Sequence, residues 1–514
     1  MVTKMKSGRL LIALFALLVC ESFAERINHE GRILGAPSVV TNAVLFNTNA
    51  ADAILSAIQI FPTTNPWNED ISRRPLLTNS DAMIAQINSD VPAANRKLKL
   101  FQEMNYVLVP SNQPLVTISF LGGYPDESDL NGGIFANGLY PISTNLPIET
   151  WPTGTGSQTL TQWQQTDDGG DRHSITVQPD SGKIFETWRT LRNGANWYAT
   201  NGAIFNLNSN TLRPDTWTSG DAAGFPMFPA LVRYDECQRG MVEHSCRLVV
   251  VKSRNQHIYP ATHHAGSVSA SQTNYPAMGQ RLRLKASYAI PANWTKEEKA
   301  LLLGLKKYGA MVSDNSSSFF SISITPDDRW GTAFDHISSV GIGITNFEAI
   351  QTTGPTEGPR SAGAPTANAG PDAIATVGVP FQLQGFVGFT SPTTNQWKLY
   401  SGPTNLTFAS ASLTNTTVTF NTNGVFTLRL SGDDGVHAVA YDVVVIASAP
   451  PPISLAIARA GTNVSLNWTG GVAPFVVERT DSFPPTWNGV VTTSLQSLTI
   501  PITNTSRFFR LRGS

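Results

Sequence analysis

The sequence has few cysteines, few charged residues and only one long apolar run. Three of its 514 residues are cysteine, and charged residues make up 14%, against roughly 25% in an average soluble protein. No C-x-x-C pair occurs, which excludes a thiolate zinc site of the usual spacing. G-x-S-x-G, H-E-x-x-H and P-loop motifs are also absent, so the sequence carries none of these common catalytic signatures.

The balance of charge is close to neutral. The chain has 36 Lys and Arg against 37 Asp and Glu, a net charge of −1. Removing residues 1–24 leaves 36 − 3 = 33 basic and 37 − 1 = 36 acidic residues, a net of −3. A nucleic-acid-binding protein needs a basic surface, so we expect no nucleic acid partner.

The apolar run lies at the start of the chain and has the pattern of a secretory signal. Basic residues precede the run at 10–20, and Ser22-Phe23-Ala24 follows it as a cleavage site. Eleven residues are too few to span a bilayer, which takes roughly 20. We predict a signal peptide at 1–24, no membrane span, and a protein that is secreted or held at the cell surface. Cys20 allows a lipoprotein as the alternative, although Val19 fits that poorly.

Two segments rich in proline and glycine divide the rest of the chain. We expect linkers at 353–365 and 448–452 because neither has apolar periodicity. They separate a large domain at 25–352, a module at 366–447 and a C-terminal module at 453–514.

The first module alternates apolar and polar residues in short runs separated by turn residues, which is typical of an antiparallel β-sandwich. Its "NAGPD" at 368–372, Trp397 followed by "SGP" at 401–403, and "GVFTLRLSGDDG" at 424–435 resemble the polycystic-kidney-disease-type Ig-like repeat. The resemblance implies a spacer or adhesion module with Trp397 in its core. Residues 453–514 resemble a fibronectin-type-III-like terminal module that closes with "FFRLR".

The large domain is predicted to be rich in β-structure. Strand patterns occur at 106–110, 115–121, 173–179, 183–188, 229–236, 246–251, 281–288 and 319–324. A helix is expected after Thr295 with Glu298 completing a capping box, and a shorter one at 80–88. The fold class is therefore mainly β: a large β-rich α+β domain followed by two small Ig-like and fibronectin-type-III-like sandwiches.

The large domain also resembles an uncharacterised family of secreted bacterial proteins. That resemblance implies secretion and no particular reaction. The stretches that carry it lie at 65–72, 170–177, 202–226, 231–236, 260–266, 278–286 and 306–317.

Histidine and aspartate gather in the middle of the large domain. "DGGDRH" at 168–173 places Asp171 and His173 two positions apart, hence on one face of a strand. A carboxylate beside an imidazole raises the pKa of the imidazole and orients it for general acid/base work. We therefore expect Asp171 and His173 to be catalytic, with Asp235, His244 and His264 nearby; a salt-bridged turn is the structural alternative.

Further residues are expected to bind substrate or a metal. His173, His244 and one of His263 and His264 form a set that could hold a divalent metal, although we assign no cofactor. Five tryptophans between 151 and 217 suggest aromatic stacking on sugar rings, with core packing as the alternative for most of them. The expected substrate-binding residues are Arg172, Arg213, Trp217 and Arg233.

The stretch "RYDECQRGMVEHSCR" at 233–247 is predicted to be a hairpin turning at "QRGM". In one register Cys237 faces Cys246 and the two form a disulfide. In the other, Asp235 lies opposite His244 and the cysteines stay apart. We expect the disulfide, because two free thiols are hard to explain in a secreted hairpin.

Together these features predict a secreted carbohydrate-active enzyme, a hydrolase or lyase, acting as a monomer on extracellular polysaccharide or cell-surface glycan. The alternative is a non-catalytic adhesin or glycan-binding protein. A single pocket holding the His and Asp residues would favour the enzyme, whereas dispersed histidines beside a flat aromatic face would favour binding.

Overall fold

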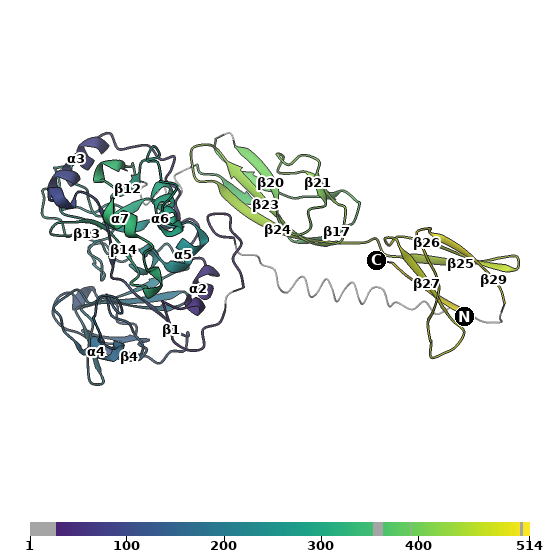
Figure 1. Cartoon of the computed structure of the whole chain (residues 1–514), viewed down its shortest axis with the longest axis horizontal. Helices are drawn as coiled ribbons and strands as arrows, with labels where there is room; N and C mark the ends of the chain where they lie inside the picture. The colour runs from purple at the N-terminus through teal and green to yellow at the C-terminus, as the bar shows by residue number, and fades with distance from the viewer. Residues whose placement is uncertain (1–26, 37, 353–362, 392, 504–506, 514) are drawn as a thin grey trace.

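The computed structural model describes residues 27–36, 38–352, 363–391, 393–503 and 507–513. The chain is mainly β, as predicted, and forms a large domain followed by two small β-modules (Figure 1). The expected signal peptide at 1–24 and most of the expected linker at 353–365 lie outside the described residues.

Three sheets build the large domain. The five-stranded sheet has the order β1-β3-β6-β7-β10; its strands are β1 (Val44–Leu45), β3 (Val107–Leu108), β6 (Ser174–Gln178), β7 (Lys183–Trp188) and β10 (Asn201–Asn206). The six-stranded sheet is β15 (Phe347–Ala349), β12 (Arg281–Leu284), β13 (Ala310–Asn315), β11 (Cys246–Val250), β14 (Phe320–Ile324) and β2 (Leu98–Gln102). The four-stranded sheet is β5 (Asn137–Tyr140), β4 (Val116–Phe120), β9 (Asn196–Ala199) and β8 (Leu191–Asn193).

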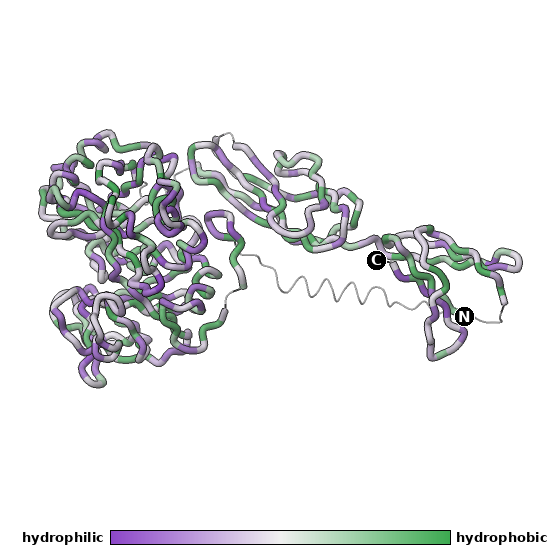
Figure 2. Tube along the Cα trace, viewed as in Figure 1, coloured by the Kyte–Doolittle hydropathy of each residue, from purple (hydrophilic) through white to green (hydrophobic). Residues whose placement is uncertain are grey.

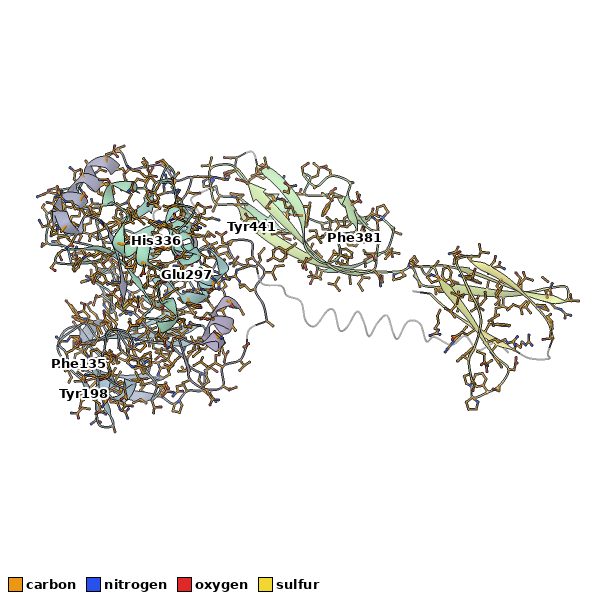
Figure 3. The ribbon with its side chains drawn as sticks, in the orientation of Figure 1. Phe135, Tyr198, Glu297, His336, Phe381 and Tyr441 are labelled. Atoms are coloured by element: carbon orange, nitrogen blue, oxygen red, sulfur yellow. The ribbon has the colours of Figure 1, made fainter. Side chains whose placement is uncertain are left out.

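Two apolar cores hold these sheets together. The smaller core joins the four-stranded and five-stranded sheets through edge-on rings: Tyr140 contacts Phe120 at 6.0 Å and Phe185 at 5.4 Å between ring centroids. The larger core lies on the six-stranded sheet and includes side chains from α3 and α6. Phe135, labelled in Figure 3 near Tyr198 of β9, precedes β5 and is 70% exposed, so it belongs to neither core.

The helices are short and peripheral: α2 (Asn49–Ser56), α3 (Ser80–Asp90), α4 (Leu160–Gln165), α5 (Tyr234–Arg239), α6 (Lys296–Lys307) and α7 (Asp335–Ser339). Single 3-10 turns add η1 (Pro66–Asn68), η2 (Ala93–Asn95), η3 (Pro125–Glu127), η4 (Phe228–Ala230), η5 (Asp328–Trp330) and η6 (Ile344–Asn346). The predicted capping box is confirmed, because Thr295 accepts from the backbone of Glu298 and Glu298 accepts from the backbone of Thr295. In the described part of the chain, no helix is long and apolar enough to span a membrane. Hydrophobic and hydrophilic segments are interspersed along all three bodies (Figure 2).

The predicted hairpin at 233–247 is wrong. Its first half is helix α5, which starts with acidic side chains and ends at Gly240 with φ of 100°. The second half enters β11, which pairs with β13 and β14. An acidic first turn, a basic last turn and a C-terminal glycine all favour a short helix, and these local signals outweighed the strand pattern. The predicted disulfide is also wrong, since Cys237 and Cys246 are free, buried thiols.

The first module is an Ig-like sandwich. Its sheets are β17 (Ala373–Thr376), β24 (Ala440–Ala449), β23 (Gly424–Asp433) and β20 (Thr394–Ser401) in that order; β18 (Phe381–Gln382), β22 (Thr417–Phe420) and β21 (Leu406–Phe408); and β16 (Thr366–Asn368) with β19 (Phe386–Gly388). The core position predicted for Trp397 is confirmed: the side chain is 1% exposed, and its indole N–H donates to the carbonyl of Thr414 at 3.0 Å.

The C-terminal module pairs two three-stranded sheets, β25 (Ser454–Ala460), β26 (Asn463–Thr469) and β29 (Ser497–Pro501), against β28 (Asn488–Thr493), β27 (Phe475–Thr480) and β30 (Phe508–Arg512). Its small core centres on Leu466, Trp468 and Phe475. Its likeness to fibronectin type III stays a prediction.

The first module contacts the large domain directly. Arg73 pairs with Asp433 at 2.6 Å. Arg429 donates to the carbonyl of Gly31 at 2.7 Å and lies over the ring of Tyr441, 4.8 Å from its centroid. Figure 3 shows Tyr441 on the side of the module next to the large domain. The module is therefore docked by polar contacts, which a free spacer would lack.

Candidate functional site

A pocket of about 290 Å³ opens where the five-stranded and six-stranded sheets meet. Its chemically active lining residues come from the ends of β6, β7 and β13 and from two loops: Tyr124, Asp171, His173, Trp188, His263 and Asp314. The pocket brings together the predicted Asp171 and His173. It contains neither Asp235 nor His244.

The β6–β7 hairpin positions three of these side chains. Asp171 and His173 come just before β6, and Trp188 ends β7, which pairs antiparallel with β6. The backbone N–H of Arg189 donates to the carbonyl of Asp171 at 2.7 Å, which closes the end of the hairpin. Arg172 between the two has φ of 49°, so the segment is bent and is not the extended strand we expected. Asp171 and His173 nevertheless line the same pocket.

Asp171 is exposed in the pocket and is oriented by an aromatic side chain. The indole N–H of Trp188 donates to Oδ1 of Asp171 at 3.2 Å. The ring of Tyr124 lies 6.2 Å from that of Trp188 and 6.4 Å from that of His263, between centroids. A carboxylate held by the indole of Trp188 therefore shares the pocket with the rings of Tyr124 and His263.

His173 forms the buried side of the pocket. It is 4% exposed, its backbone N–H donates to Oε2 of Glu149 at 3.0 Å, and the backbone N–H of Glu149 donates back to its carbonyl at 2.8 Å. Among the described residues its Nδ1 has no hydrogen-bond partner. Burial lowers the pKa of His173 to about 4, which outweighs the raising effect of Asp171. The expectation that Asp171 raises this pKa overall is therefore wrong, and the imidazole is neutral near pH 7.

Arg247 lies behind the pocket and contacts three carboxylates. Its guanidinium is 2.6 Å from Asp221, 2.8 Å from Asp314 and 3.8 Å from Glu103. One cation cannot neutralise three acids, and burial adds to their mutual repulsion. Accordingly burial raises the pKa of both Glu103 and Asp314 despite Arg247.

Glu149 lies in the same acidic surroundings. Burial, and after it the charge of Glu103, raises the pKa of Glu149 to about 8. The carboxyl therefore holds a proton at neutral pH, one hydrogen bond away from His173. When carboxyl groups near one pocket have different environments, their pKa values differ, and one can act as an acid while another acts as a base.

Asp235 and His244 belong to a second, separate cluster. Arg233 contacts Asp235 at 3.3 Å and Glu236 at 2.7 Å, and His244 contacts Glu236 at 3.0 Å. Arg239 also pairs with Asp235 at 2.5 Å. The adjoining cavity is only about 30 Å³ and shares no lining residue with the larger pocket. The expectation that Asp235 and His244 lie beside Asp171 and His173 is therefore wrong.

The histidines of the 257–264 loop are stacked on one another. The His264 ring lies between His257 and His263, with centroids 6.0 Å and 5.8 Å apart. His263 lines the pocket, whereas the predicted His264 does not line it and stacks on His263. In the described ranges, no group of three or more His, Cys, Asp or Glu side chains is placed to hold a metal ion. The three-histidine set that we expected is not assembled, because His244 lies in the other cluster.

Three of the four predicted substrate-binding residues are occupied by structural contacts. Arg172 donates to the carbonyls of Thr190 and Trp163 at 3.0 and 2.9 Å. Arg213 holds the carbonyls of Thr218 and Glu127 at 2.8 and 2.6 Å. Arg233 belongs to the second cluster.

Trp217, the fourth, is half-buried beneath the guanidinium of Arg213 and does not line the pocket. None of the four predicted substrate-binding residues therefore lines the pocket. Two aromatic residues, Tyr124 and Trp188, do line it. Trp188 is one of the five tryptophans considered for stacking on sugar rings, whereas Tyr124 was not singled out from the sequence.

Sequence reasoning also missed Glu149, Arg247 and Asp314. No motif marks them, and they lie on segments far apart in the chain. For Trp188 the sequence offers one indication of a binding role, the concentration of tryptophan between residues 151 and 217. Arg247 and Asp314 come together only because β11 pairs with β13 beside the β6–β7 hairpin.

No protein-family model matches the chain, and no curated protein is similar to it. Solved structures that resemble parts of it include the PKD domain of the KIAA 1837 protein, 23% identical with a TM-score of 0.16 over 17% of this chain and 89% of that one. The PKD domain of human KIAA0319 is 20% identical with a TM-score of 0.15 over 19% and 91%.

A nucleoside hydrolase-related hypothetical protein from Saccharophagus degradans, associated with carbohydrate metabolism, is 15% identical with a TM-score of 0.17 over 26% of this chain and 35% of that one. Likenesses with TM-scores this low carry no argument about function. Membership of the first module in the PKD family stays a prediction.

Proposed function

We propose that the large domain is a carbohydrate-active enzyme that hydrolyses glycosidic bonds of an extracellular polysaccharide. The observation that supports this most directly is the pocket in which Asp171, bound to the indole of Trp188, and Asp314, bound to Arg247, both line one cavity. Glycoside hydrolysis uses two carboxyl groups in different environments beside a sugar-binding surface.

Asp171 and Asp314 have the different environments that a base and an acid require. Asp171 is exposed and has free acceptor capacity, which suits a base or nucleophile. Asp314 is partly buried, and burial raises its pKa, which suits a general acid. His173 is neutral and fixed through Glu149, so we assign it a positioning role next to Asp171.

The charge of the pocket favours a hydrolase over a lyase that acts on uronates. A uronate lyase must neutralise the carboxylate of its substrate. The described lining residues of this pocket include no Lys or Arg, and Arg247 behind it is already engaged by three acids. A substrate carboxylate would therefore meet like charge.

Secretion of the protein belongs to the same proposal, because the signal-peptide pattern at 1–24 and the appended modules suit an extracellular substrate. A non-catalytic glycan-binding protein is the second candidate, favoured by the Tyr124–Trp188 aromatic wall, which would bind a sugar equally well without catalysis.

The test is release of reducing ends from a panel of polysaccharides by wild type, Asp171→Asn, Asp314→Asn and the matched control Asp215→Asn. Asp215 has an 81% exposed side chain outside the pocket. Each pocket variant should lose at least about 100-fold in rate, while Asp215→Asn stays near wild type. Binding without release by wild type would favour the second candidate, and full activity of both pocket variants would overturn the site.

A further inference from the structure

Acidic side chains gather at the pocket, whose described lining residues include no Lys or Arg. Asp171 is the exposed carboxylate of its lining, while burial raises the pKa of Asp314 and of Glu103 and Asp221 on the same guanidinium of Arg247. The charge of Asp171 also raises the pKa of Glu103, Glu149 and Asp314. Such a field attracts a cation and repels an anion.

Aromatic rings complete a surface that suits an ammonium group. Trp188 and Tyr124 lie side by side, and the indole N–H of Trp188 fixes the Asp171 carboxylate at its edge. An amine held between a carboxylate and an aromatic face gains from ion pairing and from cation–π attraction. A hydroxyl group at the same position gains only a hydrogen bond.

A buried imidazole gives an independent indication of a ligand. His173 is 96% buried by its 4% exposure, and its Nδ1 has no partner among the described residues. Nδ1 lies against Gly220, where an added Cβ atom would come within 3.2 Å of it. A buried polar atom left unpaired costs stability, which marks this wall of the pocket as one kept for a purpose other than packing.

We propose that the pocket selects a sugar with a free amino group, so that the substrate is a polysaccharide containing hexosamine units. The ammonium pairs with Asp171 beside the ring of Trp188, and His173 forms the buried wall next to it. This inference rests on the proposed function for the reaction, while the binding preference stands on the pocket alone.

The test is calorimetric titration of the full chain at about pH 6, where amines are protonated. The probes are glucosamine oligomers, their N-acetylated counterparts of equal length, and uronate oligomers. We expect the glucosamine oligomer to bind at least about tenfold more tightly than the N-acetylated one, and the uronate oligomer to show no binding. Added salt should reduce the advantage, because it screens charge.

Asp171→Asn, an exposed position, should reduce the preference to about threefold or less. Asp215→Asn should keep it. Equal affinity for the amino and N-acetylated oligomers, or binding of uronate, would overturn the proposal.

The outcome also separates this inference from the proposed function. Selective binding of glucosamine oligomers without any bond cleavage supports the selectivity and refutes hydrolysis. Cleavage of a neutral glycan with no preference for amines refutes the selectivity and leaves hydrolysis supported.

Discussion

The large domain contains two buried arginines surrounded by carboxyl groups and a histidine, and they differ in charge balance. Around Arg233, the acids Asp235 and Glu236 face two guanidinium groups, because Arg239 joins the cluster. Around Arg247, three carboxyl groups share one guanidinium. The first cluster adjoins a cavity of about 30 Å³ and the second a pocket of about 290 Å³.

The pKa values follow this balance. Burial opposes ionisation of Glu236, but Arg233 and His244 outweigh it and lower the pKa of Glu236 to about 2. For Glu149, burial and then Glu103 outweigh the lowering effect of Arg247, and the pKa is raised to about 8. Compensated charges hold a fold together, whereas uncompensated ones beside a pocket remain available for a ligand.

The largest effect is expected from Arg233→Met, which removes the central cation of the compensated cluster. Asp235 and Glu236 would lose their shared partner in a buried position, so the free energy of unfolding should fall by about 3 to 5 kcal/mol. Urea unfolding followed by tryptophan fluorescence measures this, with Arg239→Met as the milder control because that side chain is 23% exposed. A loss below about 1 kcal/mol would contradict the structural role.

Glu149→Gln is expected to raise the free energy of unfolding, in contrast to the loss predicted for Arg233→Met. The folded wild type holds a proton on Glu149 up to pH about 8, whereas the unfolded chain releases it above the ordinary value of 4.5. The stability of wild type therefore falls as pH rises through this window. The glutamine variant lacks this slope and should gain on the order of 2 kcal/mol on wild type between pH 5 and pH 8, a value reduced from the full shift because Glu149 is partly exposed.

Unfolding of Glu149→Gln at pH 5 and pH 8 measures that gain, and Glu297→Gln on α6 is the matched control (Figure 3). Parallel stability curves for Glu149→Gln and wild type would show that Glu149 is not held protonated, and the contrast between the two clusters would then lose its electrostatic basis.

A smaller effect is expected from Arg73→Ala, which provides an exposed ion pair as a reference. Arg73 and Asp433 are 41% and 31% exposed and join the large domain to the first module. Exposed pairs contribute about 0 to 1 kcal/mol, so the melting temperature should change little. A loss of stability as large as that of Arg233→Met would mean that solvent exposure does not determine how much an ion pair contributes in this protein.

The smallest effect is expected at the two thiols beside the compensated cluster. Cys237 and Cys246 are fully buried, and burial raises the pKa of both, so a thiol reagent should not label the native protein. In denaturant without reductant both should react, and Cys237→Ser should remove one of the two. Failure of both to react in denaturant would reveal a disulfide and would reopen the hairpin reading of this segment.

The elements with local signals were predicted well. The helix after Thr295, the strands at 174–178 and 183–188 and the core role of Trp397 follow from capping, alternation and module pattern. The segment at 233–247 was not, because its apparent strand pattern was given more weight than the acidic first turn, basic last turn and C-terminal glycine that favour helix α5. The sequence singled out Asp171 and His173, which line the pocket, and it did not single out Asp314 and Arg247; the catalytic role of Asp171 and His173 stays a prediction.

The sequence by itself determined a mainly β-chain with two appended sandwich modules and a conspicuous Asp-x-His stretch, because burial alternation, caps and turns act over a few residues. Only the tertiary structure decided which charges are compensated. Arg247 on β11 meets Glu103, Asp221 and Asp314 from three distant segments, and their pairing depends on how the sheets assemble. A pocket with excess negative charge is thus a property of the folded chain that no local pattern encodes.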